Sequence, residues 1–380
     1  MVGADPAVAV SKVPGRPEPR YLGVDAGGTF TRSALIDATG RVLARGAAGA
    51  ANHHTSDGAS VRASVREAVR GALASQSQHP QRPREASETP ATSLASAAGA
   101  AGAASEAAAH GSDVASIRAL AIGWSGLEAP GSEAEARAIV GDAVRAERMV
   151  LDSDVTAAHV GAFWGGPGVL VAAGTGSIAL GVDSSGRRVR AGGWGHRFGD
   201  EGSAVWLATE GIRSALRAVD GRGPPTSLWE ALLGHAGIAP AGHATEALAV
   251  AVTDWLYAPA RHVNDVAAFA RYVHGTTVAG DTVAMGVIEA GGRELAQLVA
   301  AAACQLGTPG PLALAGVGGV WENAPEVRAA CRAALASLLP DAAIHWVEPA
   351  TDPAVGAALM ALRADGLPLP ERTGASKGRP

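Results

Sequence analysis

The fold is decided by residues 169–190, VLVAAGTGSIALGVDSSGRRVR. The first five, Val169–Ala173, are all apolar and predict a buried strand. They run into Gly174–Ser177, a turn of small residues whose backbone N–H groups suit a phosphate. Two further strand-like segments then flank the tight turn Asp183–Gly186. The stretch therefore predicts a strand, a glycine turn and a β-hairpin in succession.

The same order of elements occurs near the N-terminus. Tyr21–Asp25 reads as a buried strand, Ala26–Arg32 as a glycine turn, and Ser33–Arg45 as a second hairpin. This repeat predicts two halves of similar architecture. The run Gly174–Ala179 also matches the dinucleotide fingerprint G-x-G-x-x-A, but a hairpin follows it where a Rossmann unit needs a helix. We therefore expect no Rossmann fold.

Size and charge limit the class of protein. A chain of 380 residues should form two domains, and a net charge of −5 gives no footprint for nucleic acid or an anionic membrane. The sequence has no apolar run of membrane-spanning length and no signal-peptide pattern, so we expect a cytoplasmic protein. Its two cysteines, Cys304 and Cys331, lie in alanine-rich helical patterns and suit a reducing compartment.

The lysine count excludes several mechanisms. The only lysines are Lys12 and Lys377, both in polar tails, so a Walker A loop, a Schiff-base lysine and a protein-kinase strand lysine are all absent. There is also no G-x-S-x-G motif and no histidine pair with metal spacing. Any phosphate chemistry must rely on backbone N–H groups, a metal ion and carboxylates.

Three segments are expected to lie outside the folded core. Residues 1–19 and 366–380 read as a disordered leader and tail. Residues 76–112 form a low-complexity insertion whose apolar content is almost all alanine, which buries too little surface to offset its ordering entropy. We expect this insertion to be dispensable for activity.

Two other stretches carry chemistry-bearing side chains. Met149–Asp154 runs from a strand into a helix, and Asp152 and Asp154 lie at the strand edge where open α/β sheets place ligands. In Ala191–Trp206, AGGWGHRFGDEGSAVW, glycines leave the backbone bare around Trp194. The carboxylates that follow could simply cap a helix. Likewise, the glycines of residues 316–319 could form a plain strand-to-helix turn.

Taken together, Asp25 with its glycine turn, Asp154, GTGS and GVGG resemble the actin/hexokinase/Hsp70-like ATPase superfamily over residues 20–365. The segment GGWGHRFGDEGSA is the most specific one. It resembles the BadF/BadG/BcrA/BcrD ATPase family, in particular its N-acetylglucosamine kinase branch. The resemblance implies an α/β fold of two actin-like (ribonuclease H-like) domains with mixed sheets flanked by helices, and with ATP and sugar in the cleft between them. The N-terminal domain would span 20–163 and be completed by a helix at 353–365, and the C-terminal domain would span 164–352.

The resemblance also implies a role for each matched residue. Asp25 would hold Mg²⁺ and Asp154 would be the general base, although the residues alone leave Asp152 open as an alternative. The residues implied in ATP binding are Gly27, Gly28, Thr29, Thr31, Gly174, Thr175, Gly176, Gly316, Gly318 and Gly319. Those implied in sugar binding are Asn52, Ser125, Ser177, Gly193, Trp194, Gly195 and Asp200. The loop around Ser125 and the pair Arg197-Phe198 depart from the family pattern.

The expected activity is transfer of the ATP γ-phosphate to the 6-hydroxyl of N-acetylglucosamine or a related amino sugar, with Mg²⁺ as cofactor. The family is often dimeric, so a homodimer is compatible with it. The alternative is a BadF-type ATPase that activates a partner enzyme, a role that needs paired cysteines for an iron–sulfur cluster. A catalytically silent sugar sensor is a further alternative. Among acceptors, glucosamine, N-acetylmuramic acid and N-acetylmannosamine stay open.

Overall fold

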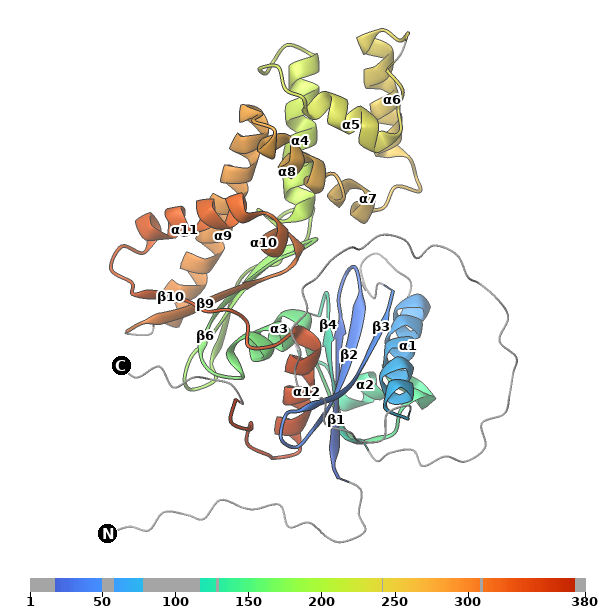
Figure 1. Cartoon of the computed structure of the whole chain (residues 1–380), viewed down its shortest axis with the longest axis vertical. Helices are drawn as coiled ribbons and strands as arrows, with labels where there is room; N and C mark the ends of the chain where they lie inside the picture. The colour runs from blue at the N-terminus through green and yellow to red at the C-terminus, as the bar shows by residue number, and fades with distance from the viewer. Residues whose placement is uncertain are drawn as a thin grey trace, which may run out of the picture.

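The computed structural model describes residues 18–49, 58–77, 117–127, 130–240, 242–307 and 310–372. The chain forms two five-stranded mixed sheets, each with its own covering helices (Figure 1). Asn52 and most of the predicted insertion at 76–112 lie outside the described residues. Among the described helices, none is long and apolar enough to cross a membrane.

The two sheets have the same topology. The first has the order β3-β2-β1-β4-β5, and the second has the order β10-β9-β6-β7-β8. In each sheet, the first three strands of the sequence pair antiparallel in succession. The last two strands run parallel to the first one. The predicted repeat of strand, glycine turn and hairpin is therefore confirmed. The strands are β1 (Arg20–Ala26), β2 (Thr31–Asp37), β3 (Val42–Ala48), β4 (Ile117–Trp124), β5 (Ala146–Ser153), β6 (Gly168–Ala173), β7 (Ser177–Val182), β8 (Arg188–Gly192), β9 (Leu312–Val317) and β10 (Ile344–Trp346).

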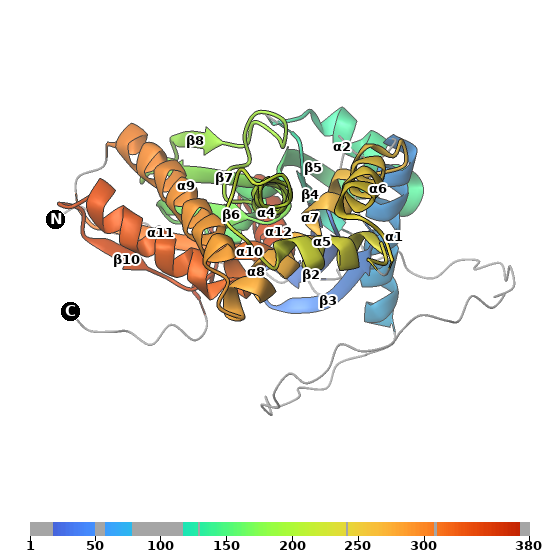
Figure 2. The ribbon, with the colours of Figure 1, turned by 90° about the horizontal axis from the view of Figure 1, so that it is seen from above.

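Helices cover both faces of each sheet. Seen from above, α9 and α11 lie along one face of the second sheet, and α4–α8 extend beyond it (Figures 1 and 2). The helices are α1 (Gly58–Ser77), α2 (Glu133–Val140), α3 (Asp154–Phe163), α4 (Ala204–Val219), α5 (Leu228–Ala236), α6 (Thr245–Tyr257), α7 (Val263–Ala267), α8 (Ala270–Val278), α9 (Thr282–Leu306), α10 (Gly319–Asn323), α11 (Pro325–Leu338) and α12 (Pro353–Ala364), with the 3-10 turn η1 (Gly141–Ala143) after α2. We call the first sheet with α1, α2 and α12 the first lobe, and the second sheet with α4–α11 the second lobe.

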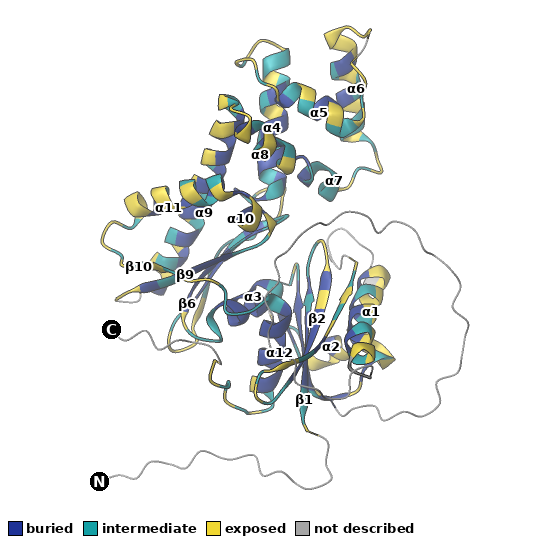
Figure 3. Ribbon diagram, viewed as in Figure 1, coloured by how far each residue is buried: buried dark blue, intermediate teal, exposed yellow. Residues whose placement is uncertain are grey.

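Helix α3 joins the two lobes. Every residue from Val155 to Ala162 is buried, so the helix has no solvent face. Ala157 packs with α12 against the first sheet, whereas Ala158 packs against Leu170 of the second sheet. Figure 3 shows the same result, with buried residues concentrated in the strands and in α3 and α12. The helix is mostly alanine, valine and glycine, as expected for a helix buried between two sheets.

Glycine allows α12 to approach the first sheet closely. A Cβ on Gly23 of β1 would lie 2.1 Å from the backbone nitrogen of Ala358 and 2.2 Å from the carbonyl oxygen of Ala354. A Cβ on Gly356 would lie 2.0 Å from the Ala157 carbonyl oxygen. Because these neighbours are backbone atoms, only glycine fits at either position. The C-terminal helix thus rests directly on β1 and α3.

Candidate functional site

The carboxylates of the site come from neighbouring strand ends in the first sheet. Asp25 of β1 pairs in register with Gly123 of β4, which pairs with Asp152 of β5. Two residues further on, Asp154 opens α3, and the hydroxyl of Ser153 caps this helix by accepting from the Thr156 N–H at 3.3 Å. The end of β1 and the strand-to-helix corner predicted at 149–154 therefore place the three aspartates at one edge of the sheet.

Burial controls the charge of two of these aspartates. Burial, followed by the charges of Asp154 and Asp352, raises the pKa of Asp25 to about 7, against the opposing charge of Arg32. Burial also raises the pKa of Asp154, against the Val155 N–H, which donates to its Oδ1 at 2.7 Å, and the Ser125 hydroxyl. Ser125, predicted as a sugar contact, thus lies against the Asp154 carboxylate.

Asp152 has different partners. Its Oδ2 accepts from Nη1 of Arg188 at 2.7 Å, and its Oδ1 accepts from the Ser153 N–H at 2.8 Å. Arg188 belongs to β8 of the second sheet, so this ion pair crosses between the lobes. Sequence reasoning missed Arg188, although the pair Arg187-Arg188 at a strand start places one side chain on each face of the sheet.

The two glycine turns meet. The hydroxyls of Thr29 and Thr175, one from each turn, are 3.2 Å apart. The second turn is fixed from behind by α4, because the carbonyl oxygens of Gly174 and Thr175 accept from the first N–H groups of this helix at 2.9 and 3.3 Å. The structure therefore brings together the two turns that the sequence predicted for ATP phosphates.

Two predicted ligand hydroxyls have internal partners. Thr31 is fully buried, and its Oγ1 donates to the Gly49 carbonyl at 2.8 Å. Ser177 is also buried, and its Oγ donates to the Glu201 carbonyl at 2.7 Å. Buried hydroxyls need such partners, so these two side chains hold the turns in place.

The third glycine run adjoins the second turn. Gly318 has a φ of 100°, and a Cβ there would lie 2.6 Å from the Ala173 carbonyl oxygen, just before the GTGS turn. Gly319 opens α10, where a Cβ would meet nothing within 4 Å. A Cβ on Gly316 would instead lie 2.0 Å from Cε2 of the Trp321 indole.

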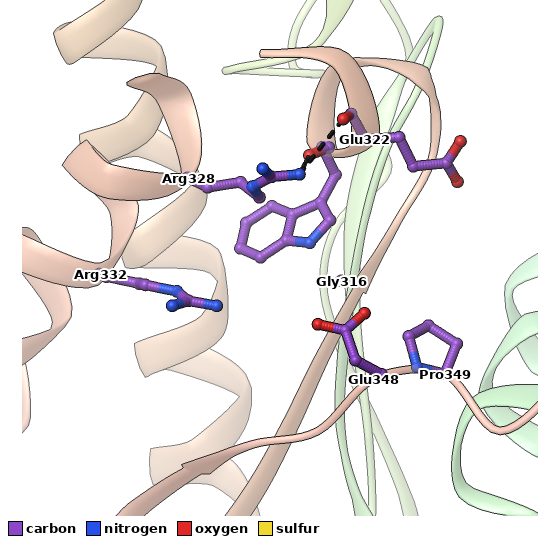
Figure 4. Close-up of a pocket in the computed structure, with 7 residues that line it drawn as sticks. Gly316, Glu322, Arg328, Arg332, Glu348 and Pro349 are labelled. Carbon is purple, nitrogen blue, oxygen red and sulfur yellow. Dashed lines mark hydrogen bonds between the residues drawn. The ribbon is translucent and has the colours of Figure 1, made fainter. Parts of the chain in front are cut away.

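Gly316 lines a separate hollow of about 340 Å³. Figure 4 shows Arg328 and Arg332 from α11 approaching it on one side and Glu348 on the other. Neither the first two glycine turns nor Asp154 contributes to its lining. This hollow is thus distinct from the place where the first two glycine turns meet.

Residues 192–203, at the end of β8 and after it, contain the residues predicted to contact a sugar, and we call this stretch the sugar wall. Gly193 and Gly195 have φ angles of 72° and 80°, and between them Trp194 is 66% exposed. The guanidinium of Arg190 lies 5.0 Å from the centroid of the Trp194 ring. Asp200 has a φ of 60°, and its Oδ1 accepts from the Ser177 N–H at 3.2 Å. Burial raises the pKa of Asp200. The wall therefore offers an exposed aromatic face and a fixed carboxylate.

Among the described residues, no group of three or more histidine, cysteine, aspartate or glutamate side chains could hold a metal ion. Asp25 nevertheless fits Mg²⁺, which can take a single carboxylate and complete its shell with water and phosphate. The charge of Asp154 raises the pKa of Asp25, which indicates that the two carboxylates are close.

Two curated proteins are similar to part of the chain. It is 28% identical over 189 residues to the N-acetylmuramic acid/N-acetylglucosamine kinase of Clostridium acetobutylicum, which covers 49% of this chain and 58% of that protein. It is 23% identical over 217 residues to the N-acetyl-D-glucosamine kinase of Dictyostelium discoideum, covering 56% and 59%. The chain thus spans less than three fifths of these curated relatives.

Solved structures match the whole fold. A Chromobacterium violaceum protein, named as a candidate N-acetylglucosamine kinase, has a TM-score of 0.64 at 25% identity and covers 91% of this chain and 99% of that one. A ROK family glucokinase from Streptomyces griseus, in complex with glucose and AMPPNP, has a TM-score of 0.54 at 16% identity, covering 90% and 99%. The two sheets are therefore the actin-like domains that the resemblance implies. The family model for the BadF/BadG/BcrA/BcrD ATPases matches residues 22–361, and the chain belongs to this family.

Proposed function

We propose that the protein is an ATP-dependent sugar kinase that transfers the γ-phosphate to the 6-hydroxyl of N-acetylglucosamine or a related amino sugar. The observation that carries the proposal is the contact between the turns that bear Thr29 and Thr175, beside the sheet edge where Asp154 lies near Asp25. The names of the curated relatives support the substrate class.

In this proposal the two glycine turns bind the ATP phosphates. Their backbone N–H groups and the hydroxyls of Thr29 and Thr175 donate to phosphate oxygens, which replaces a lysine that residues 13–376 lack. The third run, at Gly318 and Gly319, lies beside the adenosine. Preorganised donors of this kind stabilise the charge that develops on the transferred group.

Asp25 would hold Mg²⁺, largely through water. When bound, Mg²⁺ neutralises charge on the phosphate oxygens. Asp25 is suited to this role because it lies at the end of β1, directly before the glycine turn that bears Thr29. The cation would also offset the repulsion between Asp25 and Asp154.

Asp154 takes the proton of the sugar hydroxyl as that oxygen attacks the γ-phosphorus. Its raised pKa makes it a better base than an exposed aspartate, and the Ser125 hydroxyl and Val155 N–H orient it. Asp152 is a poorer choice, because its two oxygens already accept from Arg188 and Ser153. The contacts therefore favour Asp154 as the base.

The wall at 192–203 would hold the sugar. Exposed Trp194 offers an aromatic face to the C–H side of a pyranose, and Asp200 accepts from hydroxyls away from the reacting one. The bare backbone of Gly193 and Gly195 allows the ring to approach closely.

The two cysteines do not support the activator alternative. Cys331 is fully buried in the second lobe, and burial raises its pKa to about 12, whereas Cys304 is exposed on α9. Paired thiolates at a subunit interface need accessible cysteines of ordinary or lowered pKa. We therefore expect purified protein to be colourless and free of iron.

The test is a coupled ADP-release assay with amino sugars and plain hexoses, followed by the variant Asp154→Asn. This variant keeps the side-chain shape but cannot take a proton, so kcat should fall at least about 100-fold with the KM for sugar nearly unchanged. A parental kcat in Asp154→Asn, or ATP turnover that no sugar stimulates, would contradict the proposal.

A further inference from the structure

We propose that Arg188 and Asp152 form an interlobe pair that positions the base Asp154 relative to the sugar wall at 192–203; the inference rests on the kinase function proposed above. Asp152 lies on β5, the edge strand of the first sheet, and Arg188 on β8, the edge strand of the second. Their side chains meet at 2.7 Å, and the Asp152 side chain is only 9% exposed.

The pair contacts the chain on both sides of Asp154. Asp152 precedes the base by two residues and fixes the intervening Ser153 through its backbone N–H. Nη1 of Arg188 also lies 3.5 Å from Oγ1 of Thr156, in the first turn of α3. Thr156 is in turn 2.8 Å from the Ser153 hydroxyl that caps the helix. The guanidinium therefore fixes the corner from which Asp154 projects.

In the second lobe, Arg188 lies on the strand that leads directly into the sugar wall. β8 runs from Arg188 to Gly192 and leads directly into Gly193 and Trp194. The backbone path from base to wall through α3 and the second sheet is long, whereas the path through the ion pair crosses a single contact. A shift of about 1 Å at a reacting group can cost about 100-fold in rate, so this contact should act on kcat.

Removing one partner should disturb the corner. A buried carboxylate without its cation is strongly unfavourable, so Asp152 would move towards water and displace Ser153 and α3. The contact uses a single nitrogen of Arg188, and a lysine ammonium can make one such bond as a point charge. Arg188→Lys should therefore restore most of the function that Arg188→Gln loses.

The test is a double-mutant cycle with Arg188→Gln, Asp152→Asn and the double variant, together with Arg188→Lys. We expect each single variant to lower kcat at least about tenfold with both KM values within threefold, and the double variant to be no worse than the worse single one. Arg188→Lys should return kcat to within about threefold of the parent. Asp152→Asn keeps the shape of the side chain if Arg188→Gln folds poorly.

Arg187→Gln is the matched control. Arg187 is the neighbouring residue with a similarly exposed side chain, but it binds Asp183 and the carbonyls of Gln305 and Leu306 within the second lobe. Its loss should lower Tm and change kcat less than twofold. If Arg187→Gln loses as much kcat as Arg188→Gln, or if Arg188→Gln lowers Tm alone, the positioning role is wrong.

Backbone hydrogen exchange separates this inference from the proposed function. Arg188→Gln should speed exchange at the amides of residues 153–157, and Arg187→Gln should not. If the parent phosphorylates no sugar, the kinase proposal fails, yet the exchange data still decide the positioning. Unchanged protection at 153–157 would overturn it.

Discussion

Three aspartates at one sheet edge have three different environments. Asp25 lies near the charges of Asp154 and Arg32, Asp154 accepts from the Val155 N–H and the Ser125 hydroxyl, and Asp152 lies against a guanidinium from the other lobe. In the function proposed above, the same type of side chain therefore serves as a metal ligand, a base and a structural anion at one sheet edge. The difference arises from neighbours that are distant in sequence, not from the motif itself.

A buried histidine should make stability depend on pH. His159 of α3 is 2% exposed, and its Nε2 lies 3.0 Å from the Gly168 carbonyl oxygen. Burial, together with the charge of Arg188, lowers its pKa to about 4, against the hydrogen bond to Gly168. In the unfolded chain this histidine has its ordinary pKa of about 6.5. Its contribution to the free energy of unfolding is therefore fully present above that pH and is lost as the pH falls towards 4. The loss should be about 2 to 3 kcal/mol between pH 7 and pH 4.5.

Urea unfolding of the parent and of His159→Gln at both pH values tests this. The variant should be less stable at pH 7, yet lose less stability on acidification than the parent does. An equal loss in both proteins would mean that other groups cause the pH dependence.

Asp200 should control sugar affinity more than turnover. Its side chain is proposed to bind hydroxyls away from the reacting one, so Asp200→Ala and Asp200→Asn should both raise the KM for sugar at least about tenfold with a smaller change in kcat. Because its φ of 60° suits asparagine better than alanine, Asp200→Ala should also have the lower Tm. Steady-state kinetics and thermal melts separate the two effects. A loss confined to kcat would contradict the assigned role.

At this scale the motifs predicted positions better than contacts. Asp154 opens α3 and the two threonines of the turns are in contact, and the roles of all three stay predictions. The hydroxyls of Thr31 and Ser177, in contrast, are used inside the protein, because their backbone positions are buried. Arg188 could not be predicted, since its partner lies 36 residues away in another sheet.

At the scale of elements, the packing of α12 on β1 should tolerate no side chain at Gly23. Alanine there would place its Cβ about 2 Å from backbone atoms of Ala354 and Ala358, so the helix would have to move. We expect Gly23→Ala to lower the free energy of unfolding by at least about 2 kcal/mol. The control is Gly286→Ala in α9, where a Cβ meets nothing within 4 Å and should stabilise the helix slightly. Equal effects of the two substitutions would show that backbone clash is not the cause.

The regular elements could be predicted because each has a local signal. Apolar runs that end in glycine turns indicated β1 and β6, and small turns between strand-like segments indicated both hairpins. The five-residue α10 is too short for a periodic signal. The chain after residue 203 divides into α4–α9, and its glycine and proline runs mark only some of the ends of these helices.

At the scale of the whole molecule, α3 is the helix that the two lobes share. α3 packs against both sheets, and α12 packs against α3 and the first sheet. The sequence repeat predicted two similar halves, but it held no information on the contact between Thr29 and Thr175 or on the ion pair between β5 and β8. Those contacts depend on how two separately encoded sheets meet around one buried helix.

This arrangement predicts closure around the substrates. The two phosphate turns belong to different lobes. The proposed sugar wall belongs to the second lobe, and the proposed base opens α3, which packs against the first sheet. ATP and sugar together should therefore draw the two lobes towards each other, with α3 between them. Closure would also exclude water, which otherwise competes with the sugar as acceptor. Small-angle scattering should give a smaller radius of gyration with a non-hydrolysable ATP analogue plus N-acetylglucosamine than with either ligand alone or none. Arg188→Gln should still close, because its proposed defect lies in the position of Asp154 and not in binding. A radius that no combination of ligands changes would place the site elsewhere than between these two lobes.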